Sequence, residues 1–573
     1  MTVAPRAPAA QALPAILAGG RARHFAALVA NGAGQAALAA AVAVLVQRTF
    51  DGFVAAGQPW DPSALGLGAA LAAVLGGNAW LRGRAHVDAE RLGQAYVHAV
   101  RMRLFRHVLA LGEERTRSLS TGALTLRFVG DLTALRNWAA LGLARLTVSG
   151  LATLLALLAL AVIAPAIGIL TGLSVVLAGA LTLASGRFLR RTTRDLRVRR
   201  GRLAAFLNDR VARLGVVEAF GQQGRETRRF GRLSRAVRAA ALARAHAVGM
   251  VRMLADASAG AATGGALVAG GALVQLGQAT PGSVAAAMAI GGLLAGRLQD
   301  LGRVFEYRTG AEIARAKLEE LLAIQPAAAV PARRRQPLGE GAGRLALDRV
   351  RVSGRLGPID LEIAGGTRVL VTGANGAGKS TLLRVMAGLV PPSRGRVRLD
   401  GVRLDRLDAG DLRAAVALVS PDLPLLRGSL RLNLSYGAPD AGDSTLIDML
   451  ERCGLTEFLA RLPRGLDTRI AEGGTGLSSG ERTRLGLARA MLVRPRILLL
   501  DEADAHLDPQ ARGTLGAIAA SYPGTVVFAS HQAAEFRAGR ILQLGRGRIV
   551  EDSSGSDADI PAVCRRVHLV EVS

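Results

Sequence analysis

Lysine, aromatic residues and cysteine are scarce in this chain of 573 residues. Only two of its 72 basic residues are lysines, and aromatic residues make up 3% of the chain. Its two cysteines, Cys453 and Cys564, are far apart and lack metal-ligand spacing, which excludes a disulfide framework and a zinc site. Few aromatic side chains are present for nucleic-acid bases to stack on, so the net charge of +28 does not indicate nucleic-acid binding.

Long apolar runs are present, and they all fall within the first 305 residues. Each of six runs is long enough to cross about 30 Å of hydrocarbon as a helix. No apolar core followed by a cleavage site occurs in the first 24 residues, so we expect no removable signal peptide. We predict six transmembrane helices, of which the third and fourth are separated only by Ala164-Pro165: Phe25–Val46, Ala64–Leu81, Leu146–Ala164, Ala166–Ala184, Ser258–Leu276 and Pro281–Val304.

Charges between the apolar runs predict their orientation. Residues 82–136 contain ten arginines and five acidic residues, and residues 187–246 contain seventeen arginines and four acidic residues. Residues 49–63, in contrast, carry two aspartates and no basic residue. Because basic loops stay in the cytoplasm, we expect both termini to be cytoplasmic in a bacterial inner or plasma membrane. We also expect the basic loops to contact lipid head groups.

One of the two lysines, Lys379, lies in GANGAGKS, residues 373–380. The spacing G-x-x-x-x-G-K-S is that of the phosphate-binding loop, in which backbone N–H groups surround phosphate oxygens. The lysine reaches the β- and γ-phosphates, and the Ser380 hydroxyl ligates Mg²⁺. A predicted strand (Thr367–Val371) and a predicted helix (Ser380–Ala387) flank the loop. We therefore expect a nucleoside triphosphate and Mg²⁺ as cofactors, with the nucleotide bound by Gly373, Asn375, Gly376, Gly378, Lys379, Ser380 and Thr381.

Acidic residues follow a second apolar strand in ILLLDEAD, residues 497–504. Asp501 is placed to hold Mg²⁺ through a water, and Glu502 to polarise a water in line with the γ-phosphate. His531 follows the apolar strand Thr525–Ser530 and could hydrogen-bond the γ-phosphate. The alternatives are a solvated acidic turn and an ordinary surface histidine. We predict catalytic roles for Glu502 and His531 and metal binding by Ser380 and Asp501.

A third motif, GLSSGERTRLGLARAM at residues 476–491, opens a predicted helix. Ser478 and Gly480 would present a hydroxyl and free N–H groups at its positive end. By itself this pattern indicates only a helix cap. In combination, GANGAGKS, LSSGE, ILLLDE, the turn at Ala505–Asp508 and His531 resemble an ATP-binding-cassette (ABC) ATPase domain.

The preceding six spans resemble those of an exporter-type ABC half-transporter, and segments 117–131 and 217–230 resemble its intracellular loops. The resemblance implies that a second half-transporter pairs with this chain. Ser478 and Gly480 of one subunit would then cap ATP on the phosphate loop of the other. It also implies ATP-driven transport, with export expected. Import and a weakly hydrolysing or regulatory role in a heterodimer are the alternatives.

The composition shifts to Pro, Gly and Ala around Gln325–Gly343, and strand-like runs then alternate with helical ones. The predicted fold is an all-α membrane domain with six transmembrane helices, followed by an α/β P-loop NTPase domain. Its predicted parts are a cytoplasmic segment (1–24), a transmembrane domain (25–322), a linker (323–343), an ATP-binding domain (344–555) and a tail (556–573).

Three positions depart from the ABC pattern. Pro421 occupies the place of a glutamine that touches Mg²⁺ and the attacking water, and proline has no side-chain donor or acceptor. No aromatic residue lies near Gly354, where the family stacks one on adenine, and the signature reads LSSGE. Two interpretations follow: an active homodimer with altered sites, or one half of a heterodimer with unequal sites. We favour an active ATPase and, slightly, a heteromeric partner.

Charged residues in or near the spans are candidate contacts for a polar substrate. They can also satisfy one another along a helix, so they do not identify the substrate. Amphiphiles, lipids, peptides and siderophores all remain open. The candidates are Arg145, Arg252, Asp256, Arg297 and Asp300.

Overall fold

The computed structural model describes residues 12–55, 62–116, 119, 121–163, 165–325, 335–505, 507–530, 536 and 538–553. The chain divides into two compact units. The first comprises Met1–Leu111 and Arg115–Gln325, and the second comprises Pro326–Ser573 together with Gly112–Glu114.

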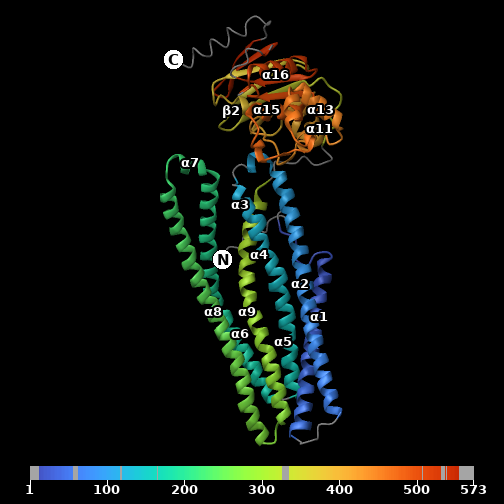
Figure 1. Cartoon of the computed structure of the whole chain (residues 1–573), viewed down its shortest axis with the longest axis vertical. Coiled ribbons are helices and arrows are strands. Elements are labelled where there is room, and N and C mark those ends of the chain that lie inside the picture. The colour runs from blue at the N-terminus through green and yellow to red at the C-terminus, as the bar shows by residue number, and fades with distance from the viewer. Residues whose placement is uncertain are drawn as a thin grey trace. The chain divides into compact units, whose positions relative to one another are not determined.

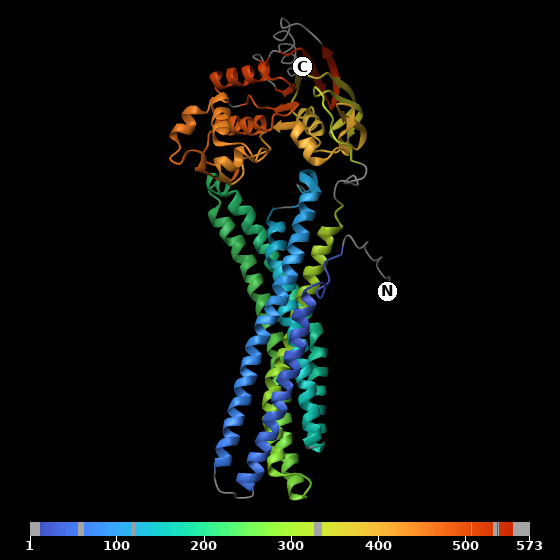
Figure 2. The same ribbon diagram turned by 90° about the vertical axis from the view of Figure 1, so that its right-hand side faces the viewer.

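The first unit consists of long helices that run side by side (Figures 1 and 2). Its six long helices are α1 (Arg21–Thr49), α2 (Pro62–Thr116), α5 (Ala144–Ile163), α6 (Pro165–Ala212), α8 (Gln223–Gln275) and α9 (Pro281–Ala323). Shorter elements connect them: η1 (Phe50–Ala55), α3 (Thr121–Leu126), η2 (Arg127–Asp131), α4 (Leu132–Asn137), η3 (Trp138–Leu143) and α7 (Leu214–Ala219).

The corner between α5 and α6 separates the third and fourth predicted spans. The first of these helices ends at Ile163 and the second begins at Pro165. Proline suits the first position of a helix because its missing N–H would have no intrahelical partner there. The two helices also approach closely, since a Cβ at Gly168 would lie 2.6 Å from the Cα of Ala161. The prediction of two helices is confirmed here.

Four stretches of the described helices are long and apolar enough to cross a membrane. They contain all or most of the first, second, third and fifth predicted spans. The fourth and sixth predicted spans lie on α6 and α9 and stay predictions. The side chains of Arg297 and Asp300 on α9 are not among the side chains that the structure describes, so these two candidate contacts stay predictions as well. The four stretches are Arg21–Gly52, Ala64–Thr116, Leu124–Val162 and Gln223–Gln275.

The second unit contains two main sheets. Strands of the first run in the order β2-β1-β4-β5, and those of the second in the order β12-β11-β3-β10-β9-β6. The five strands from β11 to β6 are parallel, and β12 pairs antiparallel at one edge. This confirms the predicted α/β class with a largely parallel sheet. The strands are β1 (Leu345–Val352), β2 (Leu356–Ile363), β3 (Arg368–Gly373), β4 (Arg394–Leu399), β5 (Val402–Arg403), β6 (Val416–Val419), β7 (Gly428–Ser429), β8 (Arg469–Ile470), β9 (Ile497–Asp501), β10 (Thr525–Ala529), β11 (Arg540–Gly545) and β12 (Arg548–Ser553).

Helices cover both faces of the larger sheet, so its central strands are apolar on both sides. Every residue of β9 and β10 is buried, and alternate residues belong to two different cores. Cys453 lies in one core, where burial raises the pKa of its thiol to about 12. The helices of this unit are α10 (Lys379–Met386), η5 (Leu404–Arg406), α11 (Ala409–Ala415), α12 (Leu430–Leu434), α13 (Asp443–Arg452), α14 (Thr456–Arg461), η6 (Gly465–Asp467), η7 (Glu472–Gly474), α15 (Ser479–Leu492) and α16 (Pro509–Ser521).

Candidate nucleotide-binding site

The GANGAGKS segment forms the loop between β3 and α10. Gly373, Gly376 and Gly378 have φ angles of 141°, 79° and 104°, which residues with a Cβ rarely adopt. At Gly378 a Cβ would also lie 2.7 Å from a methyl carbon of Leu356. Asn375 is exposed at the loop tip. The loop thus leads into the N-terminus of α10, the positive end at which an anion binds favourably.

Lys379 is buried, with its ammonium turned back onto the loop. Its Nζ donates hydrogen bonds to the carbonyl oxygens of Gly373 at 2.7 Å and Ala374 at 3.2 Å. These bonds hold the ammonium at the base of the loop, where phosphate oxygens could share it. Thr381 follows in the first turn of α10.

A hydrogen-bonded carboxylate lies at the end of β9. The Ser380 hydroxyl donates to Asp501 Oδ1 at 2.8 Å, and the Ser420 hydroxyl donates to Oδ2 at 3.0 Å. Burial raises the pKa of Asp501, while these two hydrogen bonds act to lower it. Oxygen atoms are the ligands that Mg²⁺ prefers, so Ser380 and Asp501 fit the predicted metal site.

Glu502 begins the turn that follows β9. It has a positive φ of 48°, and its N–H donates to the Ala529 carbonyl oxygen of β10 at 2.9 Å. Two residues later, the Asp504 carboxylate accepts a hydrogen bond from the Ser530 hydroxyl. The turn is therefore tied to the end of β10. His531, which follows there, lies outside the described residues and stays a prediction.

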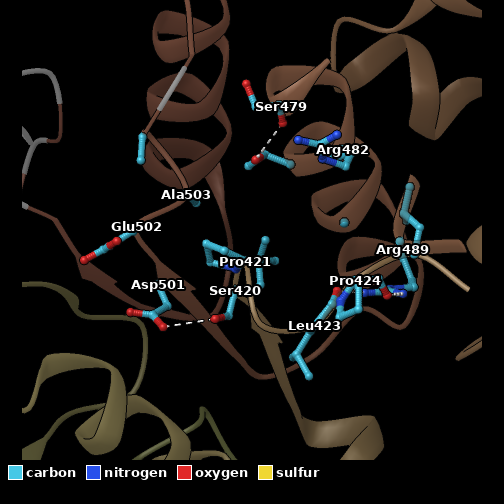
Figure 3. Close-up of a pocket in the computed structure, with 16 residues that line it drawn as sticks. Ser420, Pro421, Leu423, Pro424, Ser479, Arg482, Arg489, Asp501, Glu502 and Ala503 are labelled. Carbon is cyan, nitrogen blue, oxygen red and sulfur yellow. Dashed lines mark hydrogen bonds between the residues drawn. The ribbon is translucent and has the colours of Figure 1, made fainter. Parts of the chain in front are cut away.

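A cavity of about 510 Å³ adjoins this turn. Figure 3 shows Ser420 bonded to Asp501, with Pro421 next to it and with Ser479 and Arg482 also lining the cavity. The Asp422 carboxylate, next to Pro421, forms an ion pair with the buried Arg384 of α10.

Sequence reasoning missed Ser420 as a functional residue, although it bonds directly to the Asp501 carboxylate. The signal that could have found it is a hydroxyl directly after a β-type run, at the carboxyl end of β6. The sequence does not show that β6 and β9 are neighbours in the sheet.

The LSSGE motif forms the start of α15. Its Ser478 accepts a hydrogen bond from the Glu481 N–H at 3.1 Å, while the Glu481 carboxylate accepts from the Ser478 N–H at 2.8 Å. This reciprocal pair is a capping box. Gly480 lies in the first turn. The glutamate in LSSGE thus has a structural role in ordering the helix end.

The turn between β1 and β2 lies against the phosphate loop. A Cβ at Gly378 would be 3.2 Å from the Arg355 carbonyl oxygen in this turn. Gly354 has a φ of 73°, and a Cβ there would have open space around it. The place expected for an adenine-stacking aromatic therefore has room for a side chain but carries none.

Fold and site together define a membrane-type helical unit joined to a P-loop nucleotide-binding unit. Two family models match the chain: "ABC transporter transmembrane region" over residues 27–298 and "ABC transporter" over residues 356–505. The chain therefore belongs to the ABC transporters, with both regions fused as in a half-transporter. Membership implies that it binds ATP.

Several curated proteins are similar to this chain. The mycobactin import ATP-binding/permease protein IrtB of Mycolicibacterium thermoresistibile is 36% identical over 45% of this chain and 46% of that protein. An ATP-dependent lipid A-core flippase of Chromobacterium violaceum is 36% identical over 36% of this chain and 37% of its own length. A multidrug efflux ATP-binding/permease protein of Mycobacterium bovis is 30% identical over 66% of this chain and 32% of its own. These matches thus span about half or less of each relative.

Among solved structures, a bacterial Atm1-family ABC exporter with ATP bound has a TM-score of 0.83 at 22% identity. The superposition covers 98% of this chain and 100% of that one. The predicted exporter-type fold is confirmed over nearly the whole chain.

Proposed function

We propose that this chain is one half of a dimeric ABC transporter that couples ATP hydrolysis to substrate export. One observation carries the ATPase part of the proposal: Ser380 of the phosphate-loop helix and Asp501 of β9, 121 residues apart, meet in a hydrogen bond of 2.8 Å. This contact brings the proposed phosphate-binding and metal-binding residues to one sheet edge, as phosphoryl transfer requires.

Each group of residues has its own role in the proposed ATP binding and hydrolysis. Loop N–H groups and Lys379 bind the phosphates, and Ser380 and Asp501 hold Mg²⁺, which neutralises phosphate charge when bound. Glu502 orients and deprotonates the attacking water, while His531 contacts the γ-phosphate. The start of α15, with Ser478 and Gly480, caps ATP held by the second subunit.

The second subunit is proposed to be a different half-transporter. Pro421 provides no group for Mg²⁺ or water, and the turn at Gly354 offers no aromatic ring. A partner that contains both groups would complete one of the two ATP sites. The proposed location is a bacterial inner or plasma membrane, with the ATPase unit and both termini in the cytoplasm, because the arginine-rich loops would lie on that side.

Glu502→Gln in the native complex, reconstituted in proteoliposomes, tests the proposal. We expect hydrolysis at this chain's own site to fall by about 100-fold or more, since a general base is removed, while ATP still binds. ATP turnover of the complex should therefore fall to the rate of the partner's site. Glu551→Gln on the exposed edge strand β12 is the matched control and should hydrolyse ATP at the wild-type rate. Unchanged turnover in Glu502→Gln would instead favour a regulatory half whose own site is dispensable.

Transport direction needs a separate measurement, because the relatives' names include an importer, a flippase and an efflux protein. In inside-out vesicles supplied with external ATP, export gives ATP-dependent substrate accumulation. Net release of preloaded substrate would show import.

A further inference from the structure

A second cavity, of about 190 Å³, lies within the helical unit among α4, α6, α8 and α9. Its lining is mostly polar and includes three arginines but a single carboxylate. The side chains that matter are Thr193, Arg197, Arg200, Arg244, Glu306 and Tyr307. Such an excess of positive charge in a cavity favours an anion.

Arg197 is held in place from one side. Its Nη1 donates to the Gly310 carbonyl oxygen at 2.9 Å, and a Cβ at Gly310 would lie 2.9 Å from its Nη2. The absence of a side chain at residue 310 therefore makes room for the guanidinium. Arginine has five N–H donors. Among the described residues, Arg197 makes one hydrogen bond, the one to the Gly310 carbonyl oxygen. The remaining donors are available to a ligand.

The carboxylate in the lining is already engaged. Glu306 forms an ion pair with Arg244. Arg197, Arg200 and Arg244 lie close enough for their charges to repel one another. Asp131 attracts Arg197 electrostatically but forms no ion pair with it in the described structure. Three arginines against these two carboxylates leave an excess of one positive charge, which an anionic ligand would offset.

An uncharged donor completes the site. The Thr193 hydroxyl is buried and has no hydrogen-bond partner among the described residues. Buried polar groups in native proteins nearly always have one. Thr193 lies four residues before Arg197 on α6, so both side chains share one helix face. An oxyanion bound beside Arg197 would supply the missing partner.

The distance of the cavity along the helix axes, compared with the thickness of a bilayer, indicates which anions can reach it. At 1.5 Å per residue, Arg197 lies about 48 Å along α6 from Pro165, and Glu306 about 38 Å along α9 from Pro281. A bilayer with its head groups is about 40–45 Å thick. With both helices starting at the opposite face, Glu306 lies within the head-group layer and Arg197 a few ångströms beyond it on the proposed cytoplasmic side, where lipid head groups and soluble phosphates can both reach the cavity.

We propose that this cavity is a binding site for one phosphate group, of a phospholipid head group or a soluble phosphate ester. Its volume is below the roughly 300–1,000 Å³ of sites for drug-sized ligands, so it suits a single head group. Guanidinium groups match phosphate oxygens with paired donors. The site goes beyond the proposed ATP-driven cycle, and binding to it requires no hydrolysis.

Equilibrium binding to the purified full-length complex in detergent tests the site. Saturating Mg²⁺ and ADP block the phosphate loop. The probes are short-chain phosphatidylglycerol, glycerol phosphate and, as the phosphate-free control, a short-chain diacylglycerol. Arg197→Gln and Thr193→Val should each weaken phosphatidylglycerol binding, the former by about tenfold or more. Arg199→Gln on the same helix is the control, since Arg199 pairs with Asp195 and does not line the cavity.

Phosphatidylglycerol binding without glycerol phosphate binding identifies a lipid site, and binding of both identifies a site for soluble esters as well. Gly310→Ala keeps all charges but displaces Arg197, so it should also weaken binding. Unchanged ADP binding in each variant shows that the complex is folded. Equal binding by wild type, Arg197→Gln and Gly310→Ala would overturn the proposal, as would phosphatidylglycerol binding no tighter than that of the phosphate-free diacylglycerol. Failure of ATP hydrolysis alone would leave this result unaffected.

Discussion

At the residue scale, the loop around Pro421 lacks the expected glutamine side chain but contains the hydroxyl of Ser420. Proline cannot reach Mg²⁺ or water, but the preceding Ser420 is buried and bonded to Asp501 at 3.0 Å. Asp422, which follows Pro421, forms an ion pair with Arg384. Ser420 therefore positions the carboxylate that the proposed mechanism assigns to the metal.

Replacing Ser420 with Ala should raise the Mg²⁺ concentration needed for half-maximal ATP hydrolysis several-fold. A hydrogen bond to a charged group contributes about 1.5–3 kcal/mol, and its loss frees the Asp501 carboxylate to rotate. Nucleotide binding without Mg²⁺, measured with a fluorescent ATP analogue, should not change. Ser420→Thr retains the hydroxyl and serves as the control. If both variants show the same Mg²⁺ dependence as wild type, Ser420 has no positioning role.

At the element scale, the start of α15 depends on its capping box. Partial burial acts to raise the pKa of Glu481, but hydrogen bonds with Ser478 and Arg461 outweigh it, and the pKa lies below its usual value. The stabilisation by the hydrogen bonds of the Glu481 carboxylate is thus fully present above the ordinary glutamate pKa. It is lost as the pH falls through the lowered pKa of Glu481. An ordered helix start matters because the proposed mechanism uses it to contact the partner's ATP.

Replacing Glu481 with Ala should speed hydrogen exchange of the first-turn amides of α15 by about fivefold, as expected for a cap worth about 1 kcal/mol. Glu481→Gln retains an oxygen for the Ser478 N–H and should exchange at close to the wild-type rate. Mass spectrometry of a peptide covering residues 478–484 measures both at pH 7. Equal exchange in wild type and Glu481→Ala would show that the box does not stabilise this turn.

At the scale of the whole molecule, the proposed ATP sites need residues from two subunits. This chain contains the phosphate loop, Asp501 and Glu502, yet lacks the glutamine at residue 421 and an aromatic near Gly354. A homodimer would have these departures at both sites. A heterodimer would confine each departure to one site.

Native mass spectrometry of the complex, isolated through a tag on this chain, should therefore find a second and different subunit. A mass near twice 59.3 kDa would contradict this expectation. Both sites would then lack the two groups, and turnover would depend on residues such as Ser420 in each subunit.

Much of the fold and site follows from local spacing in the sequence. The phosphate loop, the acidic end of β9 and the break at Pro165 depend on residues close together in the chain, so short patterns were enough to predict them. Span length and loop charge likewise follow from consecutive residues. His531 was predicted in the same way and stays outside the described structure.

Tertiary structure alone decided the contacts between distant segments. Ser420 meets Asp501 across 81 residues because β6 and β9 are parallel neighbours, with Val419 paired to Leu500. Arg197 reaches Gly310 across 113 residues because α6 and α9 enclose one cavity. Strand order and helix packing arise from burial summed over the whole chain, and hydrophobic burial has no direction that a local pattern could specify.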